Sequence, residues 1–205
     1  MKALLLIDIQ NDFIPGGGLA VPEGGYIIPL ANQLQPHFDL VVATQDWHPP
    51  HHKSFASNNA GKKAFEIIDL NGLQQVLWPD HCVQGSFGAE FAAELNLNRV
   101  EAIFRKGTDP EIDSYSGFFD NGHRKSTGLA EYLRAKNIGQ LYVLGLAGDF
   151  CVFYTIMDAL EMGFETYLIQ DAVRPINQNS YEKAATEIQN AGGQIVQSGA
   201  ILSEI

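Results

Sequence analysis

The stretch QLYVLGLAGDFCVFYTIMDALEMG, residues 140–163, joins an apolar run, a turn of small residues and an amphipathic segment. Residues 140–146 are apolar almost throughout, which predicts a strand that is buried on both faces of a sheet. Residues 151–163 have the pattern of a helix and end at a glycine, as helices often do. A buried strand followed by a helix is the repeating unit of a parallel α/β sheet.

The same alternation recurs along the chain, without an internal repeat or a linker. It predicts one α/β domain over residues 1–205: a six-stranded, mainly parallel sheet with helices on both faces, in a three-layer arrangement. The other predicted strands are 3–7, 40–44, 102–105, 166–170 and 194–196, and the other predicted helices are 27–38, 87–95, 127–137 and 180–192. Two long irregular stretches, about 45–86 and 106–126, interrupt the alternation, and long loops of this kind are usually functional.

The composition excludes some partners. With 13 Lys+Arg against 24 Asp+Glu the formal net charge is −11, and no basic run occurs, so we expect neither a nucleic acid nor a membrane as partner. The first apolar run, residues 3–7, is too short for a signal peptide or a membrane span. We therefore expect a cytoplasmic protein whose two cysteines, Cys82 and Cys151, are free thiols.

Reactive side chains follow four of the predicted strands. Asp8, Asp46 and Lys106 come after three of them, and Cys151 begins the helix after the fourth. Each alone has an ordinary explanation: a turn aspartate, a solvated lysine or a small buried thiol. Parallel strands end at one edge of the sheet, where ligands bind in such folds. We therefore expect these side chains to meet in an active site.

The residue types at this edge suit nucleophilic catalysis by Cys151. A thiol attacks as the thiolate, and a helix N-terminus or a cation such as Lys106 lowers its pKa. Asp8 can accept the thiol proton and return it to a leaving group. Backbone amides of the first helical turn, where Ala147 and Gly148 leave room, can form an oxyanion hole.

A second group of side chains has the composition of a metal site. Asp46 and His48 are one residue apart in QDWHPPHHKSF (45–55), and His81 lies in a second loop, WPDHCVQGSFG (78–88). Such a set can hold one face of a metal ion and leave the opposite face open. The ligand types suit Zn²⁺, Fe²⁺ or Mn²⁺ without choosing among them, and Zn²⁺ is our first expectation. The alternative is that these histidines simply line a polar loop.

The neighbouring histidines and Cys82 have weaker assignments. His51 and His52 are adjacent, so both cannot easily be inner ligands; His52 suits a water-holding role and His51 an exposed position. His37 and His123 have no motif around them and are predicted to be structural or surface residues. Cys82 is interpreted as a buried loop thiol, with a metal thiolate as the alternative.

Long motifs spread over most of the chain carry a family resemblance: LLLIDIQNDFIPGGGLAV (4–21), TQDWHPPHHKSFAS (44–57), WPDHCVQGSFGAE (78–90), RKGTDPEIDSYSGFFDN (105–121) and GLAGDFCV (145–152). The chain resembles nicotinamidases, also called pyrazinamidases, of the isochorismatase-like cysteine hydrolases. The resemblance implies a catalytic triad of Asp8, Lys106 and Cys151. It also implies a cis peptide before Ala147, with the amides of Ala147 and Cys151 as the oxyanion hole.

The resemblance assigns the remaining site residues as well. Asp46, His48 and His81 fall on the family's metal ligands, and His52 matches a position that binds metal in only some members. Four side chains would wall a pocket for a flat aromatic ring: Phe13, Leu19, Trp78 and Tyr115. The alternative for each is that it seals a loop onto the core. Two departures, Gly148 for a common threonine and Phe150 for a common tyrosine, leave only the pocket shape in doubt.

The implied function is hydrolysis of nicotinamide to nicotinate and ammonia in NAD salvage, through a thioester on Cys151, with pyrazinamide as a side substrate. Isochorismatases and amidases for carbamoyl or ureido compounds are alternatives, but they generally lack the Asp-x-His…His set. A metal- or redox-responsive binding protein would explain a reactive cysteine and a metal site, but not the convergence of Asp8 and Lys106 on that cysteine. A catalytically silent member is disfavoured by the intact triad. The oligomeric state stays open, a homo-oligomer included.

Overall fold

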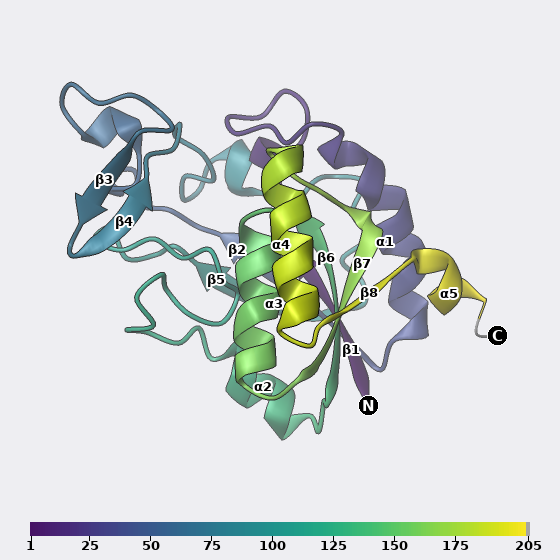
Figure 1. Cartoon of the computed structure of the whole chain (residues 1–205). Helices are drawn as coiled ribbons and strands as arrows, with labels where there is room; N and C mark the ends of the chain where they lie inside the picture. Colours follow the sequence, from purple (N-terminus) through teal and green to yellow (C-terminus); the bar gives the residue numbers. More distant parts are fainter. Residues whose placement is uncertain (204–205) are drawn as a thin grey trace.

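The structure is a computed structural model that describes residues 1–203. Six parallel strands form one sheet in the order β5-β2-β1-β6-β7-β8 (Figure 1). Every pairing within this sheet is parallel. The predicted α/β fold with a six-stranded sheet is therefore confirmed. The strands are β1 (Lys2–Ile7), β2 (Leu40–Asp46), β5 (Val100–Lys106), β6 (Gln140–Leu146), β7 (Glu165–Arg174) and β8 (Gln194–Val196).

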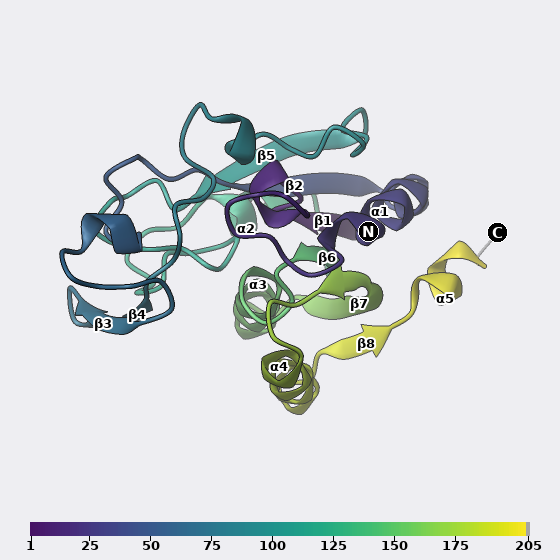
Figure 2. The ribbon, with the colours of Figure 1, turned by 90° about the horizontal axis from the view of Figure 1, so that it is seen from above.

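Helices cover both faces of this sheet. Figure 2 shows α3 and α4 on one side of the sheet, and α1 and α5 on the other. The central strand β1 is apolar on both faces, and its residues from Ala3 to Ile7 are completely buried between these layers. The helices are α1 (Ile28–Leu34), α2 (Leu129–Ala135), α3 (Cys151–Glu161), α4 (Gln178–Asn190) and α5 (Ser198–Leu202).

The helix predicted over residues 87–95 is wrong. Residues 87–89 form a single 3₁₀ turn, and no helix follows before β5 begins. The side chains of Gln10 and Gln45 both donate hydrogen bonds to the carbonyl oxygen of Ala89, and each donor–acceptor distance is 2.9 Å. Because this carbonyl is taken by distant residues, it is not available to an amide four residues later, as a helix would require.

The long stretch 45–86 contains structure that the sequence pattern did not predict. Strands β3 (Ile67–Leu70) and β4 (Leu73–Val76) pair antiparallel and form a hairpin beside the main sheet, at the upper left of Figure 1.

The strand predicted at residues 166–170 is longer in the structure, where β7 continues to Arg174. This extension carries the chain to the edge of the sheet where the candidate site lies.

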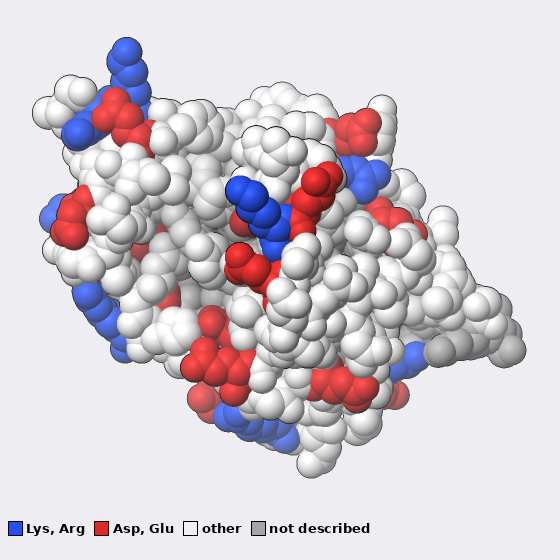
Figure 3. Space-filling model, viewed as in Figure 1, with Lys and Arg blue, Asp and Glu red and all other residues white. Residues whose placement is uncertain are grey.

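The surface carries charges of both signs. Figure 3 shows acidic and basic side chains scattered over the face seen in Figure 1, without a continuous basic patch on that face. Within residues 1–203, no helix combines the length and the apolar character needed to cross a bilayer.

Candidate active site

The side chains expected at the strand ends meet at the carboxyl edge of the sheet. Asp8 directly follows β1, Asp46 and Lys106 are the last residues of β2 and β5, and Cys151 is the first residue of α3. Asp46 and Lys106 are partners in the β2–β5 register, so the sheet itself places them side by side. All four are at most 6% exposed. Four residues far apart in sequence therefore form one buried cluster.

Lys106 is the centre of this cluster. Its Nζ atom lies 2.9 Å from Asp8 Oδ2, 2.7 Å from Asp46 Oδ1 and 3.4 Å from Cys151 Sγ. It also donates a hydrogen bond of 2.9 Å to the carbonyl oxygen of Ser114. Because the buried ammonium has two carboxylate partners, its pKa is raised well above the usual value despite burial. Lys106 is therefore a fixed positive charge between two anions and the thiol.

Thr44 holds the carboxylate of Asp8 in place. Its hydroxyl donates a hydrogen bond of 2.6 Å to Asp8 Oδ1 and accepts one of 3.2 Å from the Asp8 amide. The backbone of Asp8 is left-handed, with φ 48°, which turns the chain as it leaves β1. Thr44 lies in β2, so its role depends on the neighbouring strand, and the sequence motifs around Asp8 did not reveal it.

The pKa of Cys151 shifts in the opposite direction from the one expected. The sequence predicted that Lys106 and a helix N-terminus would lower it. Burial raises the pKa of the Cys151 thiol well above its usual value; Lys106 lowers it, but the carboxylates of Asp8 and Asp46 raise it further. Burial also raises the pKa of Asp8, against the effect of Lys106. These directions favour the neutral thiol and make Asp8 a stronger base than an exposed aspartate.

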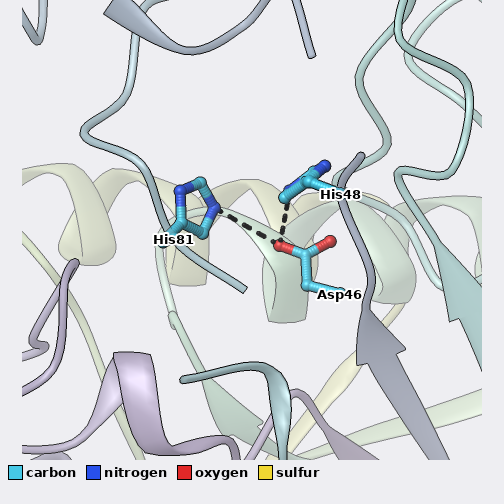
Figure 4. Close-up of side chains that lie close together, drawn as sticks. All are labelled: Asp46, His48 and His81. Atoms are coloured by element: carbon cyan, nitrogen blue, oxygen red, sulfur yellow. Dashed lines mark ion pairs between the residues drawn. The ribbon is translucent and has the colours of Figure 1, made fainter. Parts of the chain in front are cut away.

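The expected metal ligands also converge. Figure 4 shows the imidazoles of His48 and His81 directed at the carboxylate of Asp46. Their Nε2 atoms lie 3.2 Å and 3.5 Å from Asp46 Oδ2, and all three side chains are buried. The ligand atoms of these residues lie within 4.8 Å of one another. This is the spacing of a site that surrounds a single cation.

Hydrogen bonds on the far side of each ring fix which nitrogen faces the site. His48 Nδ1 lies 2.9 Å from the carbonyl oxygen of Gly107, and His81 Nδ1 lies 2.8 Å from that of Pro79. A carbonyl only accepts, so both Nδ1 atoms carry the proton and both Nε2 atoms present a lone pair toward Asp46. His48 Nε2 is buried without a hydrogen-bond partner among residues 1–203. One divalent cation satisfies this donor set, so the residues fit a metal.

Gly107 is needed for this arrangement. It has φ +66°, and a Cβ atom at this position would clash with the His48 ring.

A proton on His48 Nε2 would compete with a cation for the same lone pair. Burial lowers the pKa of His48, but Asp46 raises it, and the net shift is upward. A single proton would satisfy His48 alone, whereas a cation would satisfy His48 and His81 together.

His52 is fully buried beside this group but has the opposite polarity. Its Nδ1 atom accepts a hydrogen bond of 3.1 Å from the backbone amide of Ser54, and the Ser54 hydroxyl lies 2.7 Å away. Burial lowers the pKa of His52, and a neutral ring that accepts at Nδ1 carries its proton on Nε2. That nitrogen therefore has no lone pair for a metal. His51 is exposed, as its adjacency to His52 predicted.

One pocket is lined both by Cys151 and by residues of the candidate metal site. The space free of protein atoms within it, open solvent at its mouth included, is about 320 Å³. The four predicted wall residues, Phe13, Leu19, Trp78 and Tyr115, all line it, together with Asp46, His81, Ala147 and Cys151. The aromatic walls are fixed by edge-on ring contacts, such as Trp78 with Tyr115 at a centroid distance of 6.1 Å.

Three pocket residues were missed as wall residues: Asp113, Phe150 and Ile176. Ile176 lies two residues after the end of β7. A predicted strand that extended to Arg174 would have placed Ile176 at the carboxyl edge of the sheet, where the pocket lies. Phe150 was noted only as a departure from the family. Asp113 is a buried carboxylate near His48 and His52, and no local pattern in the sequence distinguishes it from other loop aspartates.

The loop before Cys151 has the expected cis peptide bond. The peptide between Leu146 and Ala147 is cis. Among the backbone hydrogen bonds of residues 1–203 outside helices and strands, none uses the amide of Ala147 or of Cys151 as donor. Gly148, where the family often has threonine, has no room for a Cβ atom, because Val173 and the ring of Tyr181 lie against it. The departure at Gly148 therefore changes the packing behind the loop.

Cys82 is a buried loop residue outside the reactive cluster. It is completely buried, and burial raises its pKa well above the usual value. Its amide donates a hydrogen bond of 2.7 Å to Asp12 Oδ2, and its sulfur faces the carbonyl oxygen of Gly88 at 3.9 Å. These contacts favour the structural interpretation over a metal thiolate.

The fold and this site define a class of protein. It is a parallel α/β protein in which a buried Asp–Lys–Cys cluster lies at the edge of the sheet, next to one aspartate and two histidines that could bind a metal ion. The chain matches the family described as isochorismatase domain over residues 2–200, and it belongs to that family.

Proteins similar to this chain have related names. A nicotinamidase of Acinetobacter baylyi is 47% identical over 201 residues, covering 98% of this chain and 94% of the relative. The solved structure of an Acinetobacter baumanii nicotinamidase pyrazinamidase superposes with a TM-score of 0.95 at 47% identity, covering 98% of this chain and 97% of the other. A Pyrococcus horikoshii pyrazinamidase solved in complex with zinc gives a TM-score of 0.79 at 40% identity, covering 96% and 98%.

Proposed function

We propose that this chain hydrolyses nicotinamide to nicotinate and ammonia, with Cys151 as nucleophile. The observation that carries the proposal is one pocket that is lined by Cys151, by Asp46 and His81 of the carboxylate–histidine set, and by aromatic side chains. A flat ring with a carboxamide on one side and a ring nitrogen on the other matches this arrangement. The nicotinamidase names of the similar proteins support the same substrate.

The chemistry starts from the neutral thiol. Asp8 takes the Cys151 proton as the sulfur attacks the carboxamide carbon, which forms a tetrahedral oxyanion. The protonated Asp8 then gives that proton to the amide nitrogen, the carbon–nitrogen bond breaks, and ammonia leaves a thioester on Cys151. Asp8, again a carboxylate, takes a proton from water as the water oxygen attacks the thioester. The carbon–sulfur bond breaks, Asp8 returns its proton to the thiolate, and the nicotinic acid that forms loses its remaining proton to solvent or ammonia and leaves as nicotinate.

Two fixed features stabilise the charges that develop. The amide of Ala147, in the loop after β6, and that of Cys151, the first residue of α3, would donate to the oxyanion. Lys106 stays protonated throughout, 3.4 Å from the sulfur, and would stabilise the developing thiolate. In this role Lys106 compensates the burial that raises the pKa of the thiol in the resting state.

The metal would act in recognition. Asp46, His48 and His81 would hold one divalent cation, and we expect Zn²⁺ because the ligand set suits it and a similar pyrazinamidase was solved with zinc. When bound, the cation supplies a Lewis-acid contact for the pyridine nitrogen, directly or through water. Phe13 and Trp78 would clamp the ring so that the carboxamide faces Cys151. Pyrazinamide, with the same carboxamide and ring nitrogen, is expected as a second substrate.

Metal removal is expected to abolish most nicotinamide turnover without unfolding the protein. His81→Ala should reduce bound metal from one equivalent toward none, because it removes one of three ligands. Elemental analysis and ammonia release are measured on the same samples before chelation, after it, and after Zn²⁺ is returned. His37→Ala, which changes a histidine that precedes β2 at the opposite end of that strand from Asp46, is the matched control. Full turnover by a completely metal-free enzyme would contradict the role proposed for these ligands.

The aromatic wall is expected to determine substrate affinity more than chemistry. Phe13→Leu keeps an apolar side chain at a position that is 3% exposed, but removes the ring face. We expect KM for nicotinamide to rise about fivefold, from the loss of roughly 1 kcal/mol of ring stacking, with a smaller change in kcat. Steady-state kinetics decide it, and a kcat loss at unchanged KM would show that Phe13 does not bind the ring.

A metal- or redox-responsive binding protein is the alternative from another class. It would need Cys151 to be exposed and reactive, whereas the residue is 6% exposed and its thiol has a raised pKa. An assay of ammonia release from nicotinamide separates the two functions. A cytoplasmic location stays a prediction from the sequence.

A further inference from the structure

A second group of metal-type side chains lies on the outside of α3. His123 comes from the loop before α2, while Asp158 and Glu161 lie three residues apart on α3 and so share one face of the helix. Ligand atoms of the three residues lie within 4.8 Å of one another. His123 Nε2 is 3.1 Å from Asp158 Oδ1. No residue of this group belongs to the pocket that contains Cys151.

Two buried carboxylate oxygens beside this group lack partners. Asp158 and Asp120 are each 7% exposed, and within residues 1–203 neither Asp158 Oδ2 nor Asp120 Oδ2 accepts a hydrogen bond. Both residues line the same hollow, together with His123. Burying an anionic oxygen without a partner is costly, so the hollow favours a bound cation. Burial raises the pKa of Asp158, while the Ser116 side chain and His123 lower it; a cation beside the carboxylate would lower it further.

The histidine ring is held in an orientation that suits ligation. It stacks on the ring of Phe119 with a centroid distance of 4.8 Å and an interplanar angle of 25°. Stacking fixes the plane of the imidazole, so Nε2 stays directed at Asp158. Two ligand atoms that share a Zn²⁺ ion at its usual bond lengths are about 3.0–3.4 Å apart. The spacing of 3.1 Å between His123 Nε2 and Asp158 Oδ1 is of this size.

We propose that His123, Asp158 and Glu161 form a second binding site for a divalent transition-metal ion such as Zn²⁺. An imidazole with two carboxylates selects such ions over Mg²⁺, which prefers oxygen ligands alone. The ion would join the loop that contains Tyr115 and His123 to α3. Tyr115 lines both this hollow and the pocket with Cys151, so the two sites share a wall.

The test uses enzyme whose active-site metal has been loaded and whose excess metal has been removed. Zinc chloride is titrated into it by calorimetry in a non-chelating buffer, and one additional equivalent is expected to bind. Glu161→Gln and His123→Gln should lose this equivalent at the same concentrations and keep the first metal. Both residues are exposed, so these variants are expected to fold. Glu187→Gln, which removes an exposed carboxylate from α4, is the matched control and should bind like the wild type.

Other results would overturn the assignment. If the additional equivalent is absent from the wild type, or persists unchanged in Glu161→Gln and His123→Gln, this cluster is not a metal site. Equal binding of magnesium chloride would exclude selection for a transition metal. Crystals soaked with Zn²⁺ give an independent check, with an anomalous peak expected between the three side chains in the wild type and none in Glu161→Gln. None of these readouts depends on nicotinamide turnover, so they test this site separately from the proposed reaction.

Discussion

Replacing Cys151 with alanine is expected to lower nicotinamide turnover by roughly 10⁴-fold or more while leaving the metal content at that of the wild type. The reason is that Cys151 is the residue at which the proposed covalent bond forms, so no other group in the pocket can substitute for it. Its sulfur lies 3.4 Å from Lys106 Nζ and within 4.8 Å of the Asp46 carboxylate, but it is not a member of the Asp46–His48–His81 group. Ammonia release and elemental analysis of the same preparation measure the two effects.

The other cysteine provides the matched control. Cys82→Ala removes a thiol that is also buried but lies outside the reactive cluster. We expect it to keep turnover within a small factor of the wild type and to lose modest stability from the cavity it creates. Substantial turnover by Cys151→Ala, or an equal loss in both variants, would exclude the thioester mechanism. A thioester trapped by rapid acid quench, and found by mass spectrometry on Cys151, would support the mechanism directly.

Replacing Lys106 with methionine is expected to cause the largest loss of stability of any single change at the site. The variant leaves the buried carboxylates of Asp8 and Asp46 without their ammonium partner, at 2.9 Å and 2.7 Å in the native protein. Removing one partner from a buried ion pair typically costs about 3–5 kcal/mol of unfolding free energy. Turnover should fall as well, because the charge that stabilises the thiolate is gone. Chemical denaturation and ammonia release measure the two losses.

A double variant separates charge from packing in this prediction. Lys106→Met with Asp8→Asn removes one of the two orphaned charges, so we expect it to recover part of the lost stability but no activity. Zn²⁺ is kept in excess so that the charge near Asp46 is compensated equally in both variants. If Lys106→Met alone unfolds at the wild-type denaturant concentration, the ion pairs do not contribute to stability as the geometry indicates.

Much of the site could be predicted from the sequence because it follows from strand order. Apolar runs identified the strands of the main sheet, and parallel strands must end at one edge. Asp8, Lys106 and Cys151 were therefore predicted to meet before their distances were known. The long motifs then predicted the metal ligands and the four wall residues, which all line or adjoin one pocket. Their roles in catalysis and recognition remain to be tested by the variants above.

Other features depended on contacts between distant parts of the chain. Residues 87–95 have a helical pattern, yet side chains from the ends of β1 and β2 bind the carbonyl oxygen of Ala89 and prevent the helix. Ile176 joined the pocket only because β7 extends beyond the predicted strand. His123 has no motif around it, and its position next to Asp158 became visible only in the folded chain.

The sequence by itself determined the α/β class, the strand ends and the residue types at the site, because hydrophobic periodicity and motif order are local properties. Only the tertiary structure decided the direction in which the pKa of Cys151 shifts and the nitrogen that His48, His52 and His81 each present. Those properties depend on burial and on hydrogen bonds to residues distant in sequence: burial raises the pKa of the thiol although Lys106 opposes it. The physical reason is that electrostatic free energies depend on the surroundings of a group in space, which a linear pattern does not contain.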